Sequence, residues 1–276
     1  LKAGQNHYKL SIQKIDFKQA KELMKVGYYQ MGTQIVDYFA SKLDIIVISS
    51  TLGVGALGVY NLSKELILKF VIIINAISNR VMLPVFTNYQ DDIEELKRIF
   101  VLCLKKMALF NAPIVGFVIL FCNYIVKIFY GNAFLEAIPI VQILAIWSLF
   151  VVIGQPNSLL AIATKKTNIS FWYTVVRLVI MYIMLTLFGR FSLFASAITV
   201  TLIYVIMFFV NWFMLVRKCI SLSLIEYLLV FKKACGVITL IVSSLFIIRT
   251  ALMYFNVNTD VANIVILSIY ISTIIM

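Results

Sequence analysis

The chain has 276 residues, of which 62% are hydrophobic and 13% are charged, and its mean hydropathy is +1.00. Soluble domains are about 45–50% apolar and about 25% charged, so a water-soluble fold of this size would expose too much apolar surface. Long continuous apolar runs also exclude a transmembrane barrel, whose strands alternate over about ten residues. The net charge of +12 does not indicate nucleic-acid binding, because this composition lacks a soluble basic face. The sequence therefore predicts an all-α, polytopic transmembrane helical bundle.

Residues 1–25 form a polar leader that we expect to be cytoplasmic. It has neither the apolar core nor the small-residue cleavage site of a signal peptide. Its end, DFKQAKELMKVGYY (16–29), gathers apolar and small residues on one helical face, which is typical of an amphipathic helix at a membrane interface. A soluble linker helix is the alternative. The chain starts without Met and ends within an apolar segment, so we expect both ends to be cuts through a longer protein.

Eight apolar segments follow the leader, each about as long as the 20 residues that cross a membrane. We expect the first six to form one six-helix lobe over 26–216, and 217–276 to add further transmembrane helices. The predicted spans are 26–50, 58–83, 104–126, 137–162, 169–188, 193–216, 234–253 and 261–276.

Basic residues separate strongly between alternate loops. Seventeen of the 24 Lys and Arg residues fall on one set of loops and helix ends, and three fall on the other set. Because cytoplasmic loops are enriched in Lys and Arg, we predict a cytoplasmic leader and an external loop at 51–58. The other four basic residues lie within the spans: Lys42, Lys64, Lys69 and Arg177.

A stripe of polar residues runs along the first predicted span. Asp37 lies roughly 17 Å from the start of this helix at 1.5 Å per residue, near the middle of the membrane, where a charge costs about 2.5–3.5 kcal/mol. The stripe predicts a water-filled cavity, and a buried network that joins helices is the alternative. Its heptad-like spacing places five residues on one helix face: Gln30, Gln34, Asp37, Ser41 and Asp44.

The second predicted span adds further polar candidates for the cavity. Glu65 and Lys69 stand four residues apart with the acid first, which is the favourable order for a helical ion pair. Lys69 is too deep to reach the interface easily, whereas Lys64 either extends to the outer interface or stays inside. We expect Asn61, Glu65 and Lys69 to line the cavity together with Lys42 of the first span.

The fifth predicted span contributes Arg177. An arginine stays charged and binds phosphate through two parallel hydrogen bonds, so Arg177 is a candidate ligand for an anionic cargo. A salt bridge to Asp37 or Asp44 is the alternative. Within the spans, four bases face three acids. This surplus of one cation suits an anionic cargo, or a carboxylate that titrates with a coupling ion, either a proton or Na⁺.

Other chemistry is not indicated. We find no nucleotide-binding glycine loop, no zinc-protease motif and no catalytic Ser/His set, and we expect no metal site or other cofactor. Gln90-Asp91-Asp92 opens a stretch with acids first and bases last, which is favourable for a helix start rather than for a metal site. Gln155-Pro156-Asn157-Ser158 interrupts the fourth span, where proline frees a carbonyl and bends the helix and the polar neighbours can line a cavity.

Three stretches of the sequence carry a family resemblance. They are SKLDIIVISSTLGVGALGVYNLSKEL (41–66), SNRVMLPVFTNYQDD (78–92) and LEAIPIVQILAIWSLF (135–150). In this order they resemble the C-terminal half of bacterial polysaccharide and O-antigen flippases of the Wzx and teichuronic-acid exporter type. These flippases belong to the multidrug/oligosaccharidyl-lipid/polysaccharide exporter superfamily. One departure is Ser49-Ser50, where the family usually has a glycine after its Leu-Asp motif.

The resemblance implies a two-lobe transporter of which this chain is the second lobe, with the N-terminal lobe missing. Such a protein would lie in the bacterial cytoplasmic membrane and would not be an enzyme. It would flip an undecaprenyl-pyrophosphate-linked oligosaccharide to the outer leaflet by alternating access, for lipopolysaccharide or other surface polysaccharide. The expected partners are this lipid-linked oligosaccharide, membrane lipid and the missing lobe, and not nucleic acid.

Two other functions stay open at the level of sequence. A drug/cation antiporter of the same superfamily would need a more acidic and aromatic cavity, and the basic surplus speaks mildly against it. A membrane-embedded glycan polymerase or transferase usually needs a large outer loop, and every predicted outer loop here is short.

Overall fold

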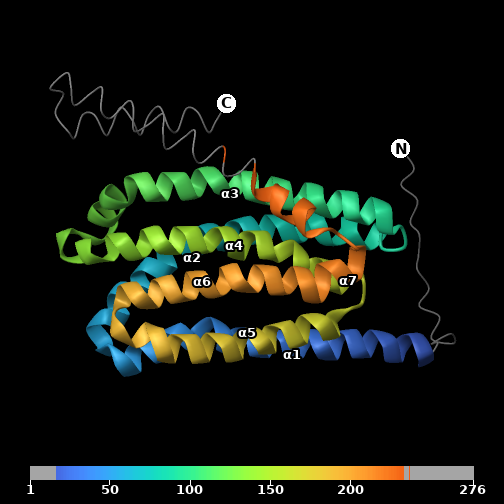
Figure 1. Cartoon of the computed structure of the whole chain (residues 1–276), viewed down its shortest axis with the longest axis horizontal. Coiled ribbons are helices and arrows are strands. Elements are labelled where there is room, and N and C mark those ends of the chain that lie inside the picture. The colour runs from blue at the N-terminus through green and yellow to red at the C-terminus, as the bar shows by residue number, and fades with distance from the viewer. Residues whose placement is uncertain (1–16, 233–235, 237–276) are drawn as a thin grey trace, which may run out of the picture.

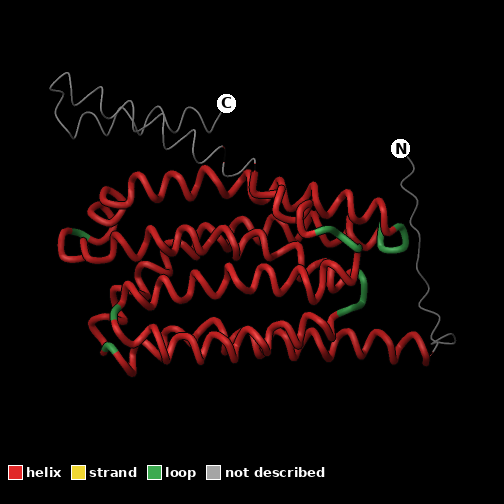
Figure 2. The backbone as a smooth tube through the Cα atoms, viewed as in Figure 1, coloured by secondary structure: helices red, strands yellow, loops and turns green. Residues whose placement is uncertain are grey.

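The computed structural model of the chain describes residues 17–232 and 236. This part is built from helices joined by short turns and contains no strand (Figure 2). Successive long helices run in opposite directions (Figure 1). The predicted all-α polytopic bundle is therefore confirmed for the described residues.

The helices follow one another with few intervening residues. The six long ones are α1 (Phe17–Thr51), α2 (Gly53–Asn88), α3 (Ile93–Tyr130), α4 (Ile138–Ala163), α5 (Thr167–Phe188) and α6 (Leu193–Asn211). Short 3₁₀ turns, η2 (Asn132–Ala137) and η3 (Gly189–Phe191), precede α4 and α6. A π-turn, η4 (Trp212–Val216), and α7 (Arg217–Ile220) extend α6, and residues 224–232 are helical again.

Local sequence explains where the helices begin and end. Asp92 accepts a hydrogen bond from the backbone N–H of Glu95 at 3.1 Å and caps α3, whose first turn carries two acids. The stretch at 90–92 is thus a helix start, as predicted. Between α1 and α2, Gly53 adopts φ +85°, a conformation that glycine reaches without strain. The expected glycine at 49–50 is not needed, because α1 continues to Thr51.

Five helical segments are long and apolar enough to cross a membrane: 53–88, 93–130, 132–163, 167–191 and 193–220. They contain the second to sixth predicted spans. The first predicted span and the end of the leader form one continuous helix, α1, and the charges at 37, 42 and 44 make it less apolar than the other five. That α1 crosses the membrane stays a prediction. The seventh and eighth predicted spans lie outside the described residues.

The long helices pack as two groups. In one group α1 packs on α5, in the other α2 and α3 pack on α4, and α6 contacts both α4 and α5 (Figure 1). The core of the bundle is apolar, with Leu104, Leu144 and Leu160 of α3 and α4 fully buried. Large apolar side chains such as Ile77 and Phe110 are exposed on the outside of the bundle, where a bilayer would solvate them.

Candidate functional site

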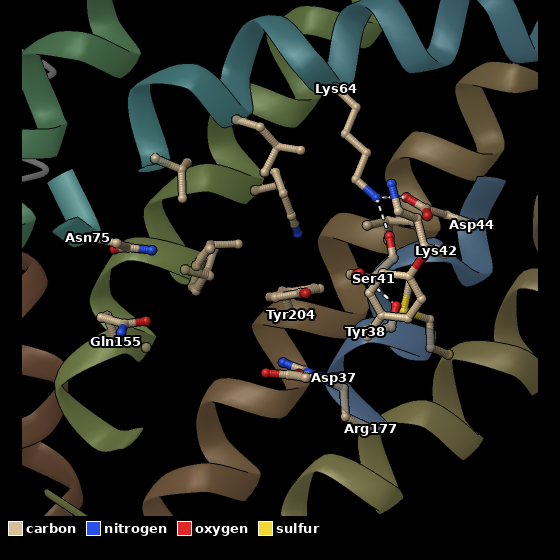
Figure 3. A pocket seen from close by; sticks show the side chains of 18 of the residues that line it. Asp37, Tyr38, Ser41, Lys42, Asp44, Lys64, Asn75, Gln155, Arg177 and Tyr204 are labelled. Atoms are coloured by element: carbon tan, nitrogen blue, oxygen red, sulfur yellow. Dashed lines mark hydrogen bonds and ion pairs between the residues drawn. The ribbon is translucent and has the colours of Figure 1, made fainter. Parts of the chain in front are cut away.

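A cavity of about 510 Å³ lies between the two helix groups, lined by α1, α2, α4, α5 and α6. Figure 3 shows its polar side chains converging from these helices. Eight of the ten predicted site residues line it: Gln34, Asp37, Ser41, Lys42, Asp44, Asn61, Glu65 and Arg177. Gln30 and Lys69 are not among its lining residues, and Lys69 is exposed.

Asp44 and Lys64 form a buried ion pair at one side of the cavity (Figure 3). The Lys64 Nζ lies 2.5 Å from the Asp44 Oδ2, and the Tyr60 hydroxyl donates to the same oxygen at 2.7 Å. Lys64 also donates to the Ser41 carbonyl at 2.9 Å, and the Ile45 N–H donates to the Asp44 Oδ1 at 2.9 Å. The ion pair and the hydrogen bonds around it join α1 to α2. Lys64 thus stays inside rather than extending to the interface.

A second ion pair connects α5 to α1. The Arg177 guanidinium contacts the Asp37 carboxylate (Figure 3) and lies 5.7 Å from the centre of the Tyr204 ring. Of the two interpretations of Arg177, the salt bridge to Asp37 is therefore present in this structure. The guanidinium keeps one unpaired donor, because its Nε is buried without a hydrogen-bond partner.

The charges that line the cavity cancel. Besides the two ion pairs, the lining contains Lys42 and Glu65, and neither has an ion pair within the described part of the chain. The spans as a whole carry one more base than acid, but the extra base, Lys69, lies outside the cavity. The surplus of one cation within the spans is therefore not found in the cavity lining, and Lys42 is the lining cation left free of a carboxylate.

Several lining residues were not among the predicted site residues. Gln155 and Asn157, from the proline-containing stretch, line the cavity as expected for that stretch, although α4 continues past Pro156 to Ala163. Gln155 donates to the Asn79 Oδ1 at 2.7 Å. Tyr204 and Asn211 of α6 also line the cavity. They lie seven residues apart and so on one helix face, and this spacing is the sequence pattern that could have indicated them.

The sequence matches proteins of polysaccharide biosynthesis. Residues 5–139 match the model of the family described as "Polysaccharide biosynthesis protein". This segment contains Asp37, Asp44 and Lys64 but not Arg177. No solved structure gives a significant match to the chain.

Three curated relatives are also named as polysaccharide biosynthesis proteins. The teichuronic acid biosynthesis protein TuaB of Bacillus subtilis (strain 168) is 28% identical over 159 residues, which cover 57% of this chain and 33% of that protein. The amylovoran biosynthesis protein AmsL of Erwinia amylovora is 27% identical over 162 residues, 59% of this chain and 42% of that protein. The lipopolysaccharide biosynthesis protein WzxC of Escherichia coli (strain K12) is 28% identical over 152 residues, 55% of this chain and 31% of that protein.

The chain thus spans about a third of the length of the curated relatives it matches, or slightly more. The motifs at 41–66 and 78–92 lie within the matched segment, and the motif at 135–150 begins in it and extends beyond its end. The matches confirm the resemblance predicted from the sequence: this is a multi-pass membrane protein whose residues 5–139 are related to the polysaccharide biosynthesis protein family.

Proposed function

We propose that this chain is part of a transporter that flips an undecaprenyl-pyrophosphate-linked oligosaccharide from the cytoplasmic to the outer leaflet, for surface polysaccharide. The observation that carries the proposal is a cavity with charged and polar walls inside a bundle of membrane-length helices. The names of the relatives, which concern teichuronic acid, amylovoran and lipopolysaccharide, support a polysaccharide cargo. We propose a transporter rather than an enzyme, working by alternating access together with an N-terminal lobe.

The pyrophosphate would meet two cationic groups in the cavity. Lys42 offers an ammonium group without a carboxylate partner in the described residues, and Arg177 offers its buried Nε. The pyrophosphate of such a cargo carries one negative charge on each of its two phosphates and can bind a guanidinium through two parallel hydrogen bonds, so the cargo would displace Asp37 from Arg177. The released Asp37 carboxylate would then be free to take up a coupling proton or Na⁺.

The direction of the helices supports an orientation with the leader end on the cytoplasmic side. The start of α1 lies at the same end of the bundle as the α2–α3 turn, the α4–α5 turn and α7 (Figure 1). This end carries basic residues such as Lys97, Lys165 and Lys218, whereas Arg190 lies at the opposite end. By the positive-inside rule, the leader end would face the cytoplasm of a bacterial cell.

The lipid-linked glycan pool tests the proposal. Polyprenyl lipids are extracted from cells in which the gene is deleted and analysed by mass spectrometry, and their leaflet is probed in spheroplasts. We expect the completed lipid-linked glycan to accumulate on the inner leaflet. An unchanged pool with normal sidedness would remove the flippase function and favour a drug/cation antiporter, for which Glu65 would be the acid to examine.

A further inference from the structure

The cavity contains buried polar groups that nothing in the described structure satisfies. Six buried side-chain atoms of the described residues have no hydrogen-bond partner, and five of these belong to residues that line this cavity. Native proteins pair nearly all buried polar groups, so this concentration of unpaired groups in one place indicates a ligand-binding site. The five atoms are the Asn75 Oδ1, Trp147 Nε1, Asn157 Oδ1, Arg177 Nε and Asn211 Oδ1.

The unpaired groups would be satisfied by a ligand that both donates and accepts hydrogen bonds. Trp147 and Arg177 can only donate through these nitrogens, whereas the three asparagines present amide oxygens that accept. A phosphate group, which accepts, would satisfy the donors and leave the amide oxygens unpaired. Hydroxyl groups donate and accept at once, and a set of them on one ring would serve both kinds of partner.

Aromatic rings form the apolar part of the same walls. Trp147 packs against Tyr204 with ring centres 5.5 Å apart, and Phe150 packs against Phe208 at 6.0 Å. All four residues line the cavity. Sites for small molecules combine such apolar and aromatic walls with a few placed polar groups, in volumes of about 300–1,000 Å³. A pyranose ring, with apolar C–H faces and a rim of hydroxyls, has the matching chemistry.

The amide end and the charged end of the cavity are spatially separate. In Figure 3, Asn75 and Gln155 lie on one side, Asp44, Lys42 and Lys64 lie on the other, and Tyr204 lies between them. One molecule that carries both an anionic group and a neutral sugar could therefore place each at its own end.

We propose that Trp147, Asn157 and Asn211 form a subsite for a neutral, hydroxylated sugar ring, with a role distinct from that of the cationic groups Lys42 and Arg177. This inference rests on the proposed function, since it takes the sugar to be part of the lipid-linked cargo. It assigns the unpaired Trp147 nitrogen and the unpaired amide oxygens of Asn157 and Asn211 to the glycan, and the cationic groups to the pyrophosphate.

Two lipid probes of one protein test the subsite. The full-length protein is purified into nanodiscs, and the affinities for undecaprenyl pyrophosphate and for the lipid-linked glycan extracted from deletion cells are measured separately. Wild type should bind the glycan-bearing lipid more tightly. Trp147→Phe and Asn211→Leu should each weaken glycan-lipid binding by about two- to tenfold, as expected for one lost hydrogen bond, and leave undecaprenyl pyrophosphate binding unchanged.

A matched control is available in the same bundle. Asn111 of α3 is also buried with an unpartnered side-chain nitrogen, but it does not line the cavity, so Asn111→Leu should change neither affinity. Trp147→Phe keeps the aromatic packing, and the elution profile of each variant in size exclusion checks its folding. Equal binding of both lipids, or cavity variants that bind like wild type, would overturn the subsite while leaving the proposed function in place. Failure of wild type to bind either lipid would overturn both.

Discussion

Lys64 of α2 places its ammonium 2.5 Å from the Asp44 carboxylate of α1, with the side chain of Asp44 fully buried and that of Lys64 8% exposed. The helices on either side of this contact pack mainly on other partners, α1 on α5 and α2 on α4. The ion pair is thus one of the direct links between the two helix groups that enclose the cavity.

Removing one charge of this pair should destabilise the bundle. Lys64→Met leaves Asp44 buried without its partner, and breaking a buried ion pair in this way costs about 3–5 kcal/mol. We expect a clear drop in the thermal unfolding temperature, measured in detergent by fluorescence-detected size exclusion.

The double variant Asp44→Leu/Lys64→Met is the control for this prediction. Replacing both charges by apolar groups is often neutral or stabilising, so the double variant should recover much of the lost stability. A double variant as unstable as the single one would show that the Tyr60 and Ser41 contacts, rather than the charge pair, hold the two helices together.

Cargo transport should depend on the cavity cations and not on basic residues in general. The double variant Lys42→Gln/Arg177→Gln should abolish complementation of a deletion strain and restore the accumulation of lipid-linked glycan, with normal expression. Lys69→Gln is the matched control, because Lys69 lies in the same lobe but outside the cavity lining. Loss of function with Lys69→Gln and not with the double variant would contradict this assignment.

The contact between α1 and α5 should be sensitive to a side chain added at Gly32. A Cβ at Gly32 would lie 2.9 Å from the Phe171 ring, whereas a Cβ at Gly27, five residues earlier on α1, would meet nothing within 4 Å. Gly27→Ala should be neutral or stabilising, by up to about 1 kcal/mol from helix propensity. Gly32→Ala should unfold at a lower temperature than Gly27→Ala in the same detergent. Equal melting temperatures would mean that Phe171 moves aside freely.

The helix at 224–232 should be held less firmly against α3 in acid. The backbone N–H of Ser223 and the ammonium of Lys97, 3.2 Å away, lower the pKa of Glu226 from its ordinary value of 4.5. A lowered pKa means that this stabilisation is present above pH 4.5 and is lost as the pH falls through the folded value. The effect is small because the pair is partly exposed. The protection factors of the 224–232 amides, corrected for the intrinsic pH dependence of exchange, should therefore fall below about pH 4.5 in wild type, and Glu226→Gln should show the lower protection already at neutral pH.

The sequence predicted the helices better than their contacts. Apolar runs of about 20 residues separated by Gly, Pro and charged turns are a strong signal, so five of the predicted spans lie inside observed helical segments, although α3 begins well before the span predicted at 104–126. The boundary predicted at residue 25 does not coincide with a helix end, because α1 runs from Phe17 to Thr51. An amphipathic lead-in and an apolar segment can form one helix without any break in α-helical hydrogen bonding.

The site was predictable along α1 and less so elsewhere. The stripe from Gln34 to Asp44 was visible because its polar residues repeat on one face. Lys64 and Lys69 illustrate the limit: they lie five residues apart and so on different faces of α2. Which of these faces meets α1 depends on how α2 rotates against α4, and a single sequence does not contain that rotation.

The neutral sum of the cavity charges has a consequence for the return stroke of a carrier. Moving one net charge across a membrane potential of 100 mV involves about 2.3 kcal/mol. With Asp37 on Arg177, Asp44 on Lys64, and Lys42 offset by Glu65, the cavity of an unloaded lobe carries no net charge. If the lobe reorients as proposed, the membrane potential would act on the loaded form and leave the empty form free to reset.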